Sequence, residues 1–272
     1  MNIKNNLNAI NANRSHEKTQ SAKAKSNEKL SSGQKINRGA DDAAGLAISE
    51  KMLRQIFALS KATANAQDGI SGIQVADGAL GQVNEMLNRM NELGVRAGNE
   101  TLSEEERYSI QAEMDALKSE VDRVAETATF NGQKLLDGSF DGKRLQVGSE
   151  ASEENQISIT IGNMNWDSIS GNSSVSIESS QLADTMEGIR TALESVSLMR
   201  SDMGASQNQL ESTISNLRNA TENITAANSG IRDTDMASEM VRNSNQNILS
   251  RVQEAMQAQA NQNNRNVLSL LN

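Results

Sequence analysis

The sequence contains no proline in 272 residues. Because proline interrupts the hydrogen bonds of a helix, its absence permits very long uninterrupted helices. Cysteine is also absent, which excludes disulfide bonds, thiolate metal sites and cysteine nucleophiles. Aromatic residues make up only 2% of the chain, so few large side chains could fill a rounded core. Smaller apolar residues must form the core instead, and they suit thin seams between helices.

Charge and hydropathy exclude further classes of protein. The net charge of −9 disfavours non-specific nucleic-acid binding. The chain has no run of 18 apolar residues, so we expect no transmembrane helix and no membrane partner. The first residues, MNIKNNLNAINANR, lack the cationic and apolar regions of a cleavable signal peptide. If the protein is secreted, it therefore needs another route.

Helical heptads dominate the first half of the chain. Leu7 and Ile10 belong to a short apolar seam that soon becomes too polar to be stable alone. A break at LSSGQKIN is followed by a helix that we expect to start near Asp41 and Asp42, whose acids suit a helix N-terminus. The heptad phase of this helix shifts near Ala76, which predicts a stutter.

Glycines and a capping box mark the next features. The glycines at 69, 72, 78 and 81 weaken the long helix but permit close approach of another helix. Ser103 is a good N-cap, and Glu106 stands at the capping-box position of the following helix. We expect this second helix to fold back on the first as a helical hairpin.

The middle of the chain is typical of β structure. FNGQKLLDGSFDGKRLQVG contains one Asn-Gly and two Asp-Gly pairs, which are hairpin turn sequences. NQISITIG alternates apolar and polar residues as a strand does, and Val175 and Ile177 favour a further short strand. The serine-rich stretch 168–180 is predicted to be an exposed loop. Heptads return from Gln181 to the end, including Met240, Ile248, Val252 and Met256 near the C-terminus.

These patterns predict a mainly α fold: a long antiparallel helical rod or coiled coil of paired N- and C-terminal segments, with a small central β-hairpin region. Residues 1–42 with 232–272 would form a terminal helical coiled coil. Residues 43–180 with 181–231 would form a helical rod, whose β region lies at about 130–180.

Five blocks of sequence resemble bacterial flagellins, and they occur in that family's order. They are LSSGQKINRGADDAAGLAIS, NAQDGISGIQVADGAL, SIQAEM, TATFNGQKLLDG and QANQNNRNVLSLL. The resemblance covers most of the chain outside roughly 140–180. It implies a structural subunit of the bacterial flagellar filament and no enzyme. Because the middle insertion is short, the large outer domains of the family are expected to be absent.

The resemblance also implies location and partners. Flagellins are exported unfolded through a narrow channel, so we expect an extracellular flagellar protein without a cleaved signal peptide. The expected partners are further copies of the chain, hook-associated proteins and the filament cap, an export chaperone on the C-terminal helices, and a host innate immune receptor.

The terminal segments are predicted to carry assembly. They contain too few apolar residues for independent stability, so we expect them to be disordered in the monomer and to fold on polymerisation. Neighbouring subunits would bury Leu7, Ile10, Val267, Leu268, Leu270 and Leu271. Asn264 stands where the family often has proline, so the last segment could continue as helix.

A second candidate surface lies around LNRMNELGVRA. Arg89 and Leu93 lie at the edge of an apolar stripe, and Glu113 borders the stripe of the next helix. One interpretation is structural, with charges pairing across a helical hairpin. The resemblance favours another: Toll-like receptor five recognises flagellins through residues that match Arg89, Leu93 and Glu113. In this interpretation, Arg89 and Leu93 face outward to the receptor or the next subunit.

Catalytic and metal sites have little support. His16 is the only histidine, and two ligands at helical spacing would be needed to hold zinc, so we expect no metal. Asp41 and Asp42 are better explained as helix-start acids than as catalytic carboxylates, and no cofactor is expected. The alternative functions are a hook–filament junction protein, which would not propagate, and a secreted enzyme on a flagellin scaffold, for which no residue constellation exists.

Overall fold

The computed structural model describes residues 6–99, 101–171, 173–178 and 181–271, without the side chains of 264 and 267–271. Its contacts divide the chain into two compact units. Unit 1 comprises Met1–Ile56 with Asn223–Asn272, and unit 2 comprises Phe57–Glu222. The sequence analysis placed this division at the ends of helices, at 42/43 and 231/232. The contacts place it inside two long helices, α2 (Ala43–Ala97) and α5 (Leu182–Arg232), which contribute to both units.

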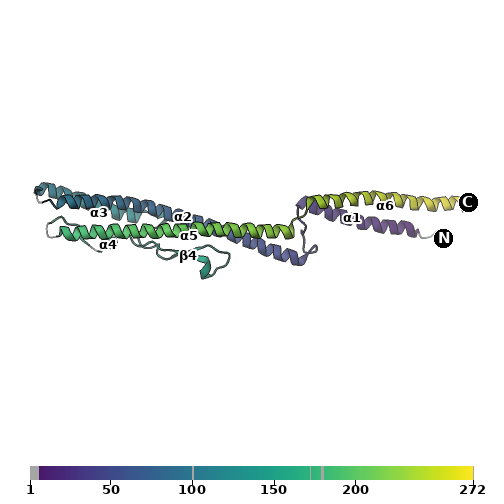
Figure 1. Ribbon diagram of the computed structural model, residues 1–272. Coiled ribbons are helices and arrows are strands. Elements are labelled where there is room, and N and C mark those ends of the chain that lie inside the picture. The colour runs from purple at the N-terminus through teal and green to yellow at the C-terminus, as the bar shows by residue number, and fades with distance from the viewer. Residues whose placement is uncertain (1–5, 100, 172, 179–180, 272) are drawn as a thin grey trace. The chain divides into compact units, whose positions relative to one another are not determined.

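Unit 1 contains two long helices that lie side by side, α1 (Leu7–Ser32) and α6 (Met236–Leu271) (Figure 1). The predicted break after α1 is confirmed: Gly33 ends the helix in the left-handed conformation, at φ 71°. Just beyond this glycine, Gln34 and Asp233 form an isolated antiparallel bridge. Lys35 N donates to Arg232 O at 2.6 Å, and Thr234 N donates to Gly33 O at 3.0 Å.

Unit 2 is built on the packing of α2 against α5 and α3 (Glu104–Thr127). The predicted capping box at the start of α3 is confirmed, because Ser103 Oγ accepts from Glu106 N and the Glu106 carboxylate accepts from Ser103 N. The predicted return of α3 along α2 is also confirmed, since their buried residues form one core. The mainly α fold class with a small central β region is therefore correct.

From Ala62 to Ala97 the buried positions of α2 follow one unbroken heptad pattern, so the stutter predicted near Ala76 is wrong. These positions recur at intervals of four and three: Ala62, Ala66, Gly69, Ile73, Ala76, Leu80, Val83, Leu87, Met90, Gly94 and Ala97. A seam drawn through the apolar Ile70 instead of Gly69 produces a false shift of phase near Ala76. The heptad stays regular because glycine occupies two seam positions that neighbouring side chains fill.

Two small antiparallel hairpins interrupt the helices. β1 (Thr129–Phe130) pairs with β2 (Gln133–Lys134) through a two-residue turn, in which Asn131 and Gly132 both have positive φ, 51° and 75°. This geometry confirms the Asn-Gly turn. β3 (Lys143–Gln146) pairs with β4 (Gln156–Ile159), with a short 3-10 helix η1 (Glu153–Asn155) between them.

The serine-rich stretch differs from its prediction. It begins within the short helix α4 (Trp166–Ile169), and Ile169, Ser170 and Ile177 are buried, so it is not an exposed loop throughout. Val175 and Ile177 do not form a strand. The segment 173–178, which we call the strap, is instead held by side chains of α3 and α5.

The glycines of α2 at 69, 72, 78 and 81 serve the predicted purpose only in part. A methyl group at Gly69 would collide with Leu145 of β3, and one at Gly72 would touch Phe130 of β1. At Gly69 the same methyl group would also touch Leu210 of α5 at 3.5 Å, so the close neighbours are the β hairpins and, at this one position, another helix. Gly78 has open space around it, with no heavy atom within 4 Å of an added Cβ.

We predict opposite effects for two alanine substitutions in α2. Gly78→Ala should raise the free energy of unfolding by about 0.5–1 kcal/mol, because alanine favours the helix and meets nothing. Gly69→Ala should lower it by about 1 kcal/mol or more, because the methyl group overpacks the site beside Leu145. Urea unfolding followed by the fluorescence of Trp166, the single and fully buried tryptophan, measures both in unit 2. Equal stabilisation by the two substitutions would contradict the close packing at Gly69.

Candidate assembly and recognition surfaces

The seam between α1 and α6 is polar. On α6, the residues turned away from solvent recur at intervals of four and three, which is the spacing of a helix seam. They are Glu239, Asn243, Gln246, Ser250, Gln253, Gln257 and Ala260. The matching face of α1 runs through Ala12, His16, Thr19, Lys23, Ser26 and Leu30. The hydrophobic effect therefore contributes little to the pairing of these helices.

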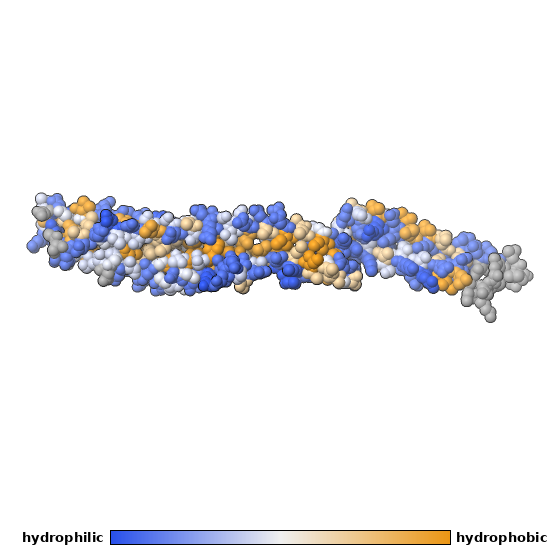
Figure 2. Space-filling model, turned by 60° about the horizontal axis from the view of Figure 1, so that its bottom comes forward, coloured by the Kyte–Doolittle hydropathy of each residue, from blue (hydrophilic) through white to orange (hydrophobic). Residues whose placement is uncertain are grey.

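The apolar residues of α6 lie on its other side, exposed to solvent. At 100° per residue, these residues cover the side opposite the polar seam, around Val241 and Ile248, and also both flanks of the seam. They are Met236, Met240, Val241, Ile248, Leu249, Val252 and Met256, and all are between 43% and 63% exposed. Figure 2 shows orange apolar side chains on the surface of this pair, toward the chain ends. Such a contiguous exposed apolar face is typical of a surface that binds another protein.

Part of the predicted assembly set can be placed. Leu7 and Ile10 are 65% and 48% exposed on α1, so within the chain both are free to be covered by another molecule. The side chains of Val267, Leu268, Leu270, Leu271 and Asn264 lie outside the described residues. The backbone of α6 continues to Leu271, and the helix runs through position 264.

The charged residues of the second candidate surface are brought together in unit 2. Arg89 on α2 donates from Nε and Nη2 to Glu113 Oε1 on α3, at 3.0 and 2.9 Å, and from Nη1 to Glu92 Oε2 at 3.1 Å. The hydrogen bond to Glu113, with that to Glu92, holds the pKa of Arg89 above its ordinary value. The side chains of Arg89 and Glu113 remain 50% and 44% exposed, so this pair borders the helical hairpin and faces solvent.

Leu93 does not face outward, and this part of the prediction is wrong. It is only 2% exposed and belongs to the core of unit 2. The reason is that α2 packs on both α3 and α5, which buries a wider face than a two-helix seam would. Gly94 beside it lets Met186 of α5 approach closely. Of the three predicted residues, Arg89 and Glu113 thus lie at the surface and Leu93 lies in the core.

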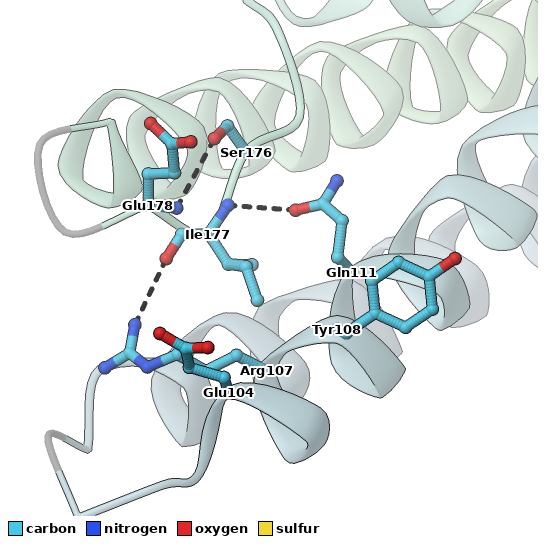
Figure 3. Close-up of a pocket in the computed structure, with 7 residues that line it drawn as sticks. All are labelled: Glu104, Arg107, Tyr108, Gln111, Ser176, Ile177 and Glu178. Carbon is cyan, nitrogen blue, oxygen red and sulfur yellow. Dashed lines mark hydrogen bonds between the residues drawn. The ribbon is translucent and has the colours of Figure 1, made fainter.

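A shallow hollow that the sequence analysis missed lies between α3 and the strap (Figure 3). Its volume is about 650 Å³, and Glu104, Arg107, Tyr108 and Gln111 line it from α3. Tyr108 is 77% exposed at its rim. Glu178 adds a second carboxylate from the strap.

The strap is held along both edges by side chains. On one edge, Ile177 N donates to Gln111 Oε1 and Gln111 Nε2 donates to Val175 O, both at 3.0 Å. On the other edge, Ser176 N donates to Thr185 Oγ1 at 3.1 Å, and the Thr185 hydroxyl donates to Ser176 O at 2.7 Å. The side chains of Gln111 and Thr185 thus satisfy backbone groups of the strap that neighbouring strands would satisfy in a sheet. The alternation of Val175 and Ile177 indicated extended backbone, but no local pattern indicates partners 64 residues away.

The candidate metal and acid residues have other roles. Among the described residues, no group of three or more His, Asp or Glu side chains could hold a metal ion. Asp42 accepts from Gly45 N and caps the start of α2, whereas Asp41 accepts from Asn37 N and Arg38 N and closes the turn before this helix. Within the part of the chain that the structure describes, no helix is both long and apolar enough to cross a membrane.

Together these surfaces define a class: helical proteins whose paired terminal helices present apolar faces for association with other molecules. Comparison with known proteins gives the family. A protein-family model described as "Bacterial flagellin N-terminal helical region" matches residues 3–141 of this chain. A second model, "Bacterial flagellin C-terminal helical region", matches residues 186–271. The chain belongs to the bacterial flagellin family.

Full-length relatives agree with this assignment. A flagellin of Halalkalibacterium halodurans is 45% identical over 269 residues, which cover 99% of each chain. A flagellin of Bacillus subtilis is 43% identical over 305 residues, covering 100% of each chain. The flagellar filament 31.3 kDa core protein of Treponema maltophilum is 43% identical over 283 residues, covering 99% of each.

Two solved structures show the same fold. A flagellin of Bacillus cereus matches with a TM-score of 0.51 at 22% identity, over 57% of this chain and 88% of that one. A putative flagellar hook-associated protein of Vibrio parahaemolyticus matches with a TM-score of 0.60 at 12% identity, over 71% of this chain and 100% of that one.

We predict that Gln111→Ala loosens the strap. Removing the amide leaves Ile177 N and Val175 O without their partner, which should lower the free energy of unfolding of unit 2 by about 1–3 kcal/mol. Trp166 fluorescence in urea is again the probe, because Trp166 Nε1 donates to Ser173 O of the strap. Gln209→Ala on the exposed surface of α5 is the matched control and should change stability by less than about 0.5 kcal/mol. The same small effect for both variants would show that the amide does not hold the strap.

Proposed function

We propose that this chain is the structural subunit of a bacterial flagellar filament and that it polymerises through its terminal helices. The observation that carries the proposal is the exposed apolar face of α6, with Leu7 and Ile10 of α1. Full burial of one large apolar side chain contributes about 1.5–3 kcal/mol, so several together would stabilise a contact between subunits. The family membership and the full-length flagellin relatives support the same function.

A helical polymer follows from how such faces can be covered. Within the chain, α1 meets α6 through the polar seam, so no described element of unit 1 covers the apolar face. Other copies can cover it by contacts that do not close a ring, and repetition of such contacts gives an open helical filament. The terminal segments of the free chain would order as the polymer forms.

The proposed location is extracellular, in the flagellum, and the proposed role is structural and not catalytic. Hook-associated proteins would bind the chain at the filament base and the filament cap at its tip. The apolar face of α6 is suited to an export chaperone before assembly, because a chaperone would shield the surface that later contacts other subunits.

We predict that removing residues 1–42 and 232–272 abolishes polymerisation, because both faces of the terminal pair are lost. The full chain should form long filaments on seeding or salting out, as seen by electron microscopy. The truncated chain should stay in the supernatant after centrifugation. Its circular dichroism and Trp166 emission serve as the control that unit 2 is still folded. Filaments of the truncated chain would contradict the proposal.

The same microscopy separates the alternative function. A hook–filament junction protein would bind filament ends without propagating. The likeness to the Vibrio hook-associated protein is at 12% identity and concerns the fold alone, whereas the flagellin relatives are 43–45% identical over almost the whole chain. We therefore favour the filament subunit.

We further propose that the surface around Arg89 and Glu113 is recognised by the innate immune receptor Toll-like receptor five. The support is its geometry and its resemblance to the recognised residues of the family. A guanidinium and two carboxylates are held together and half-exposed, whereas Leu93 lies in the core. A charged cluster held in place by hydrogen bonds loses little side-chain freedom on binding, which favours a binding hot spot.

We predict that Arg89→Ala and Glu113→Ala each lower receptor activation in a cell reporter assay by about tenfold or more, as expected when a hot-spot contact is lost. Arg190→Ala is the matched control, because Arg190 forms a similar exposed ion pair with Glu187 on α5. It should leave activation unchanged. Full potency of both test variants would rule out this surface, and polymerisation of each variant should be measured in parallel.

A further inference from the structure

Three polar pairs cross the seam between α1 and α6 at regular spacing. Asn27 faces Asn243, whose Nδ2 donates to Asn27 Oδ1 at 2.6 Å. Gln20 Nε2 donates to Ser250 Oγ at 3.2 Å, and Gln257 Nε2 donates to Asn13 Oδ1 at 3.5 Å. The α1 members are seven residues apart, and so are the α6 members. We call these three pairs the polar rungs.

The regular spacing means that one register holds along the seam. In an antiparallel pair, each advance of seven residues on α1 must meet a retreat of seven on α6, and all three rungs satisfy this condition. A slip by one heptad in one direction would set Asn27 opposite Met236 and Asn13 opposite Ser250, whereas the opposite slip pairs polar residues again and is opposed by the backbone anchor between Lys35 and Arg232. The first slip would leave Asn27 without a polar partner across the seam.

Burial of apolar side chains does not favour the observed rotation of α6 about its axis relative to α1. The hydrophobic effect would favour turning the apolar face of α6 toward α1. Instead the seam encloses four buried polar atoms that lack a hydrogen-bond partner: His16 Nδ1, Ser26 Oγ, Gln246 Oε1 and Gln253 Oε1. Enclosing such atoms opposes the pairing. Specific polar contacts must therefore select the observed rotation.

The backbone anchors the pair at one end, and near the other end Asn6 Nδ2 donates to Ala260 O at 3.1 Å. At the first end, backbone hydrogen bonds join Gly33–Lys35 to Arg232–Thr234, which fixes where α1 ends and α6 begins. The Arg232 side chain also donates to Gln34 and Glu50. This anchor does not determine which side of α6 faces α1 several turns away. The rungs lie along that remaining length.

We propose that the polar rungs set the register and the rotation of α6 against α1, so that the apolar face of α6 stays turned outward. Polar seam residues are known to specify register at a cost in stability. The rungs thus act as positioning residues for the surface that other molecules cover. This inference concerns the structure of a single chain and stands whether or not that chain polymerises.

The absence of cysteine in the native chain allows a direct test by disulfide formation. The first reporter is Asn13→Cys with Gln257→Cys, which joins the two sides of the seam. The second is Asn13→Cys with Ala255→Cys, in which the α6 partner is exposed and lies roughly 160° around the helix from Gln257. Each pair is placed in the full chain and oxidised, and peptide mass spectrometry gives the yield. Mixing ¹⁵N-labelled with unlabelled chains separates bonds within a chain from bonds between chains.

With the other two rungs intact, the seam reporter should form within the chain and exceed the outward reporter. Gln20→Ala with Asn27→Ala removes both remaining rungs, and the ratio of seam to outward yields should then fall by about tenfold, as expected for two lost hydrogen bonds. Lys18→Ala with Lys25→Ala, at exposed positions of α1, is the matched control and should leave the ratio unchanged.

An unchanged ratio after removal of both rungs would overturn the inference, since the anchor would then suffice. No preference for the seam reporter in either soluble or sedimented chains would also overturn it. A chain that shows the predicted ratios but forms no filaments would contradict the proposed function and leave the rungs supported.

Discussion

Unit 2 depends on the burial of one face of α2 against two partners. An unbroken heptad of buried positions runs from Ala62 to Ala97, and α3 and α5 cover it together. Two of these positions are glycines, and each admits a side chain from elsewhere: Leu145 at Gly69 and Met186 at Gly94. Shape complementarity at these two glycines therefore positions two elements on α2: the β3–β4 hairpin and the first turns of α5. The small residues that weaken an isolated helix here allow close tertiary packing.

Unit 1 reverses this arrangement. Its helices face each other through Asn, Gln, Ser and Glu, and they leave valine, isoleucine, leucine and methionine in solvent. Such a pair gains little from hydrophobic burial within the chain and has much apolar surface available to other chains. Unit 2 thus buries its apolar residues within the chain, whereas unit 1 leaves many of them exposed. This contrast is what a subunit needs if one part must fold alone and another must be completed by assembly.

Two surface features of unit 2 are held in place by side chains from separate helices. Arg89 of α2 is held between Glu92 of the same helix and Glu113 of α3, so hydrogen bonds between two helices keep these charged groups in place at the surface. The strap is fastened by Gln111 and Thr185 in place of neighbouring strands, which closes the core around Trp166 without a third hairpin. In both cases, side chains from separate helices do what local backbone structure alone could not.

Local patterns determined the helices, their caps and the first hairpin. The absence of proline, the capping box at Ser103 and Glu106, and the Asn131–Gly132 turn act within a few residues, so they can be recognised from the sequence. The sequence also showed that Leu7 and Ile10 were too few to sustain a helix pair alone. Only the tertiary structure decided that Leu93 is buried, because that required knowing that α2 has two partners. It also decided which side of α6 meets α1, since apolar periodicity identifies a face to be covered but not the molecule that covers it.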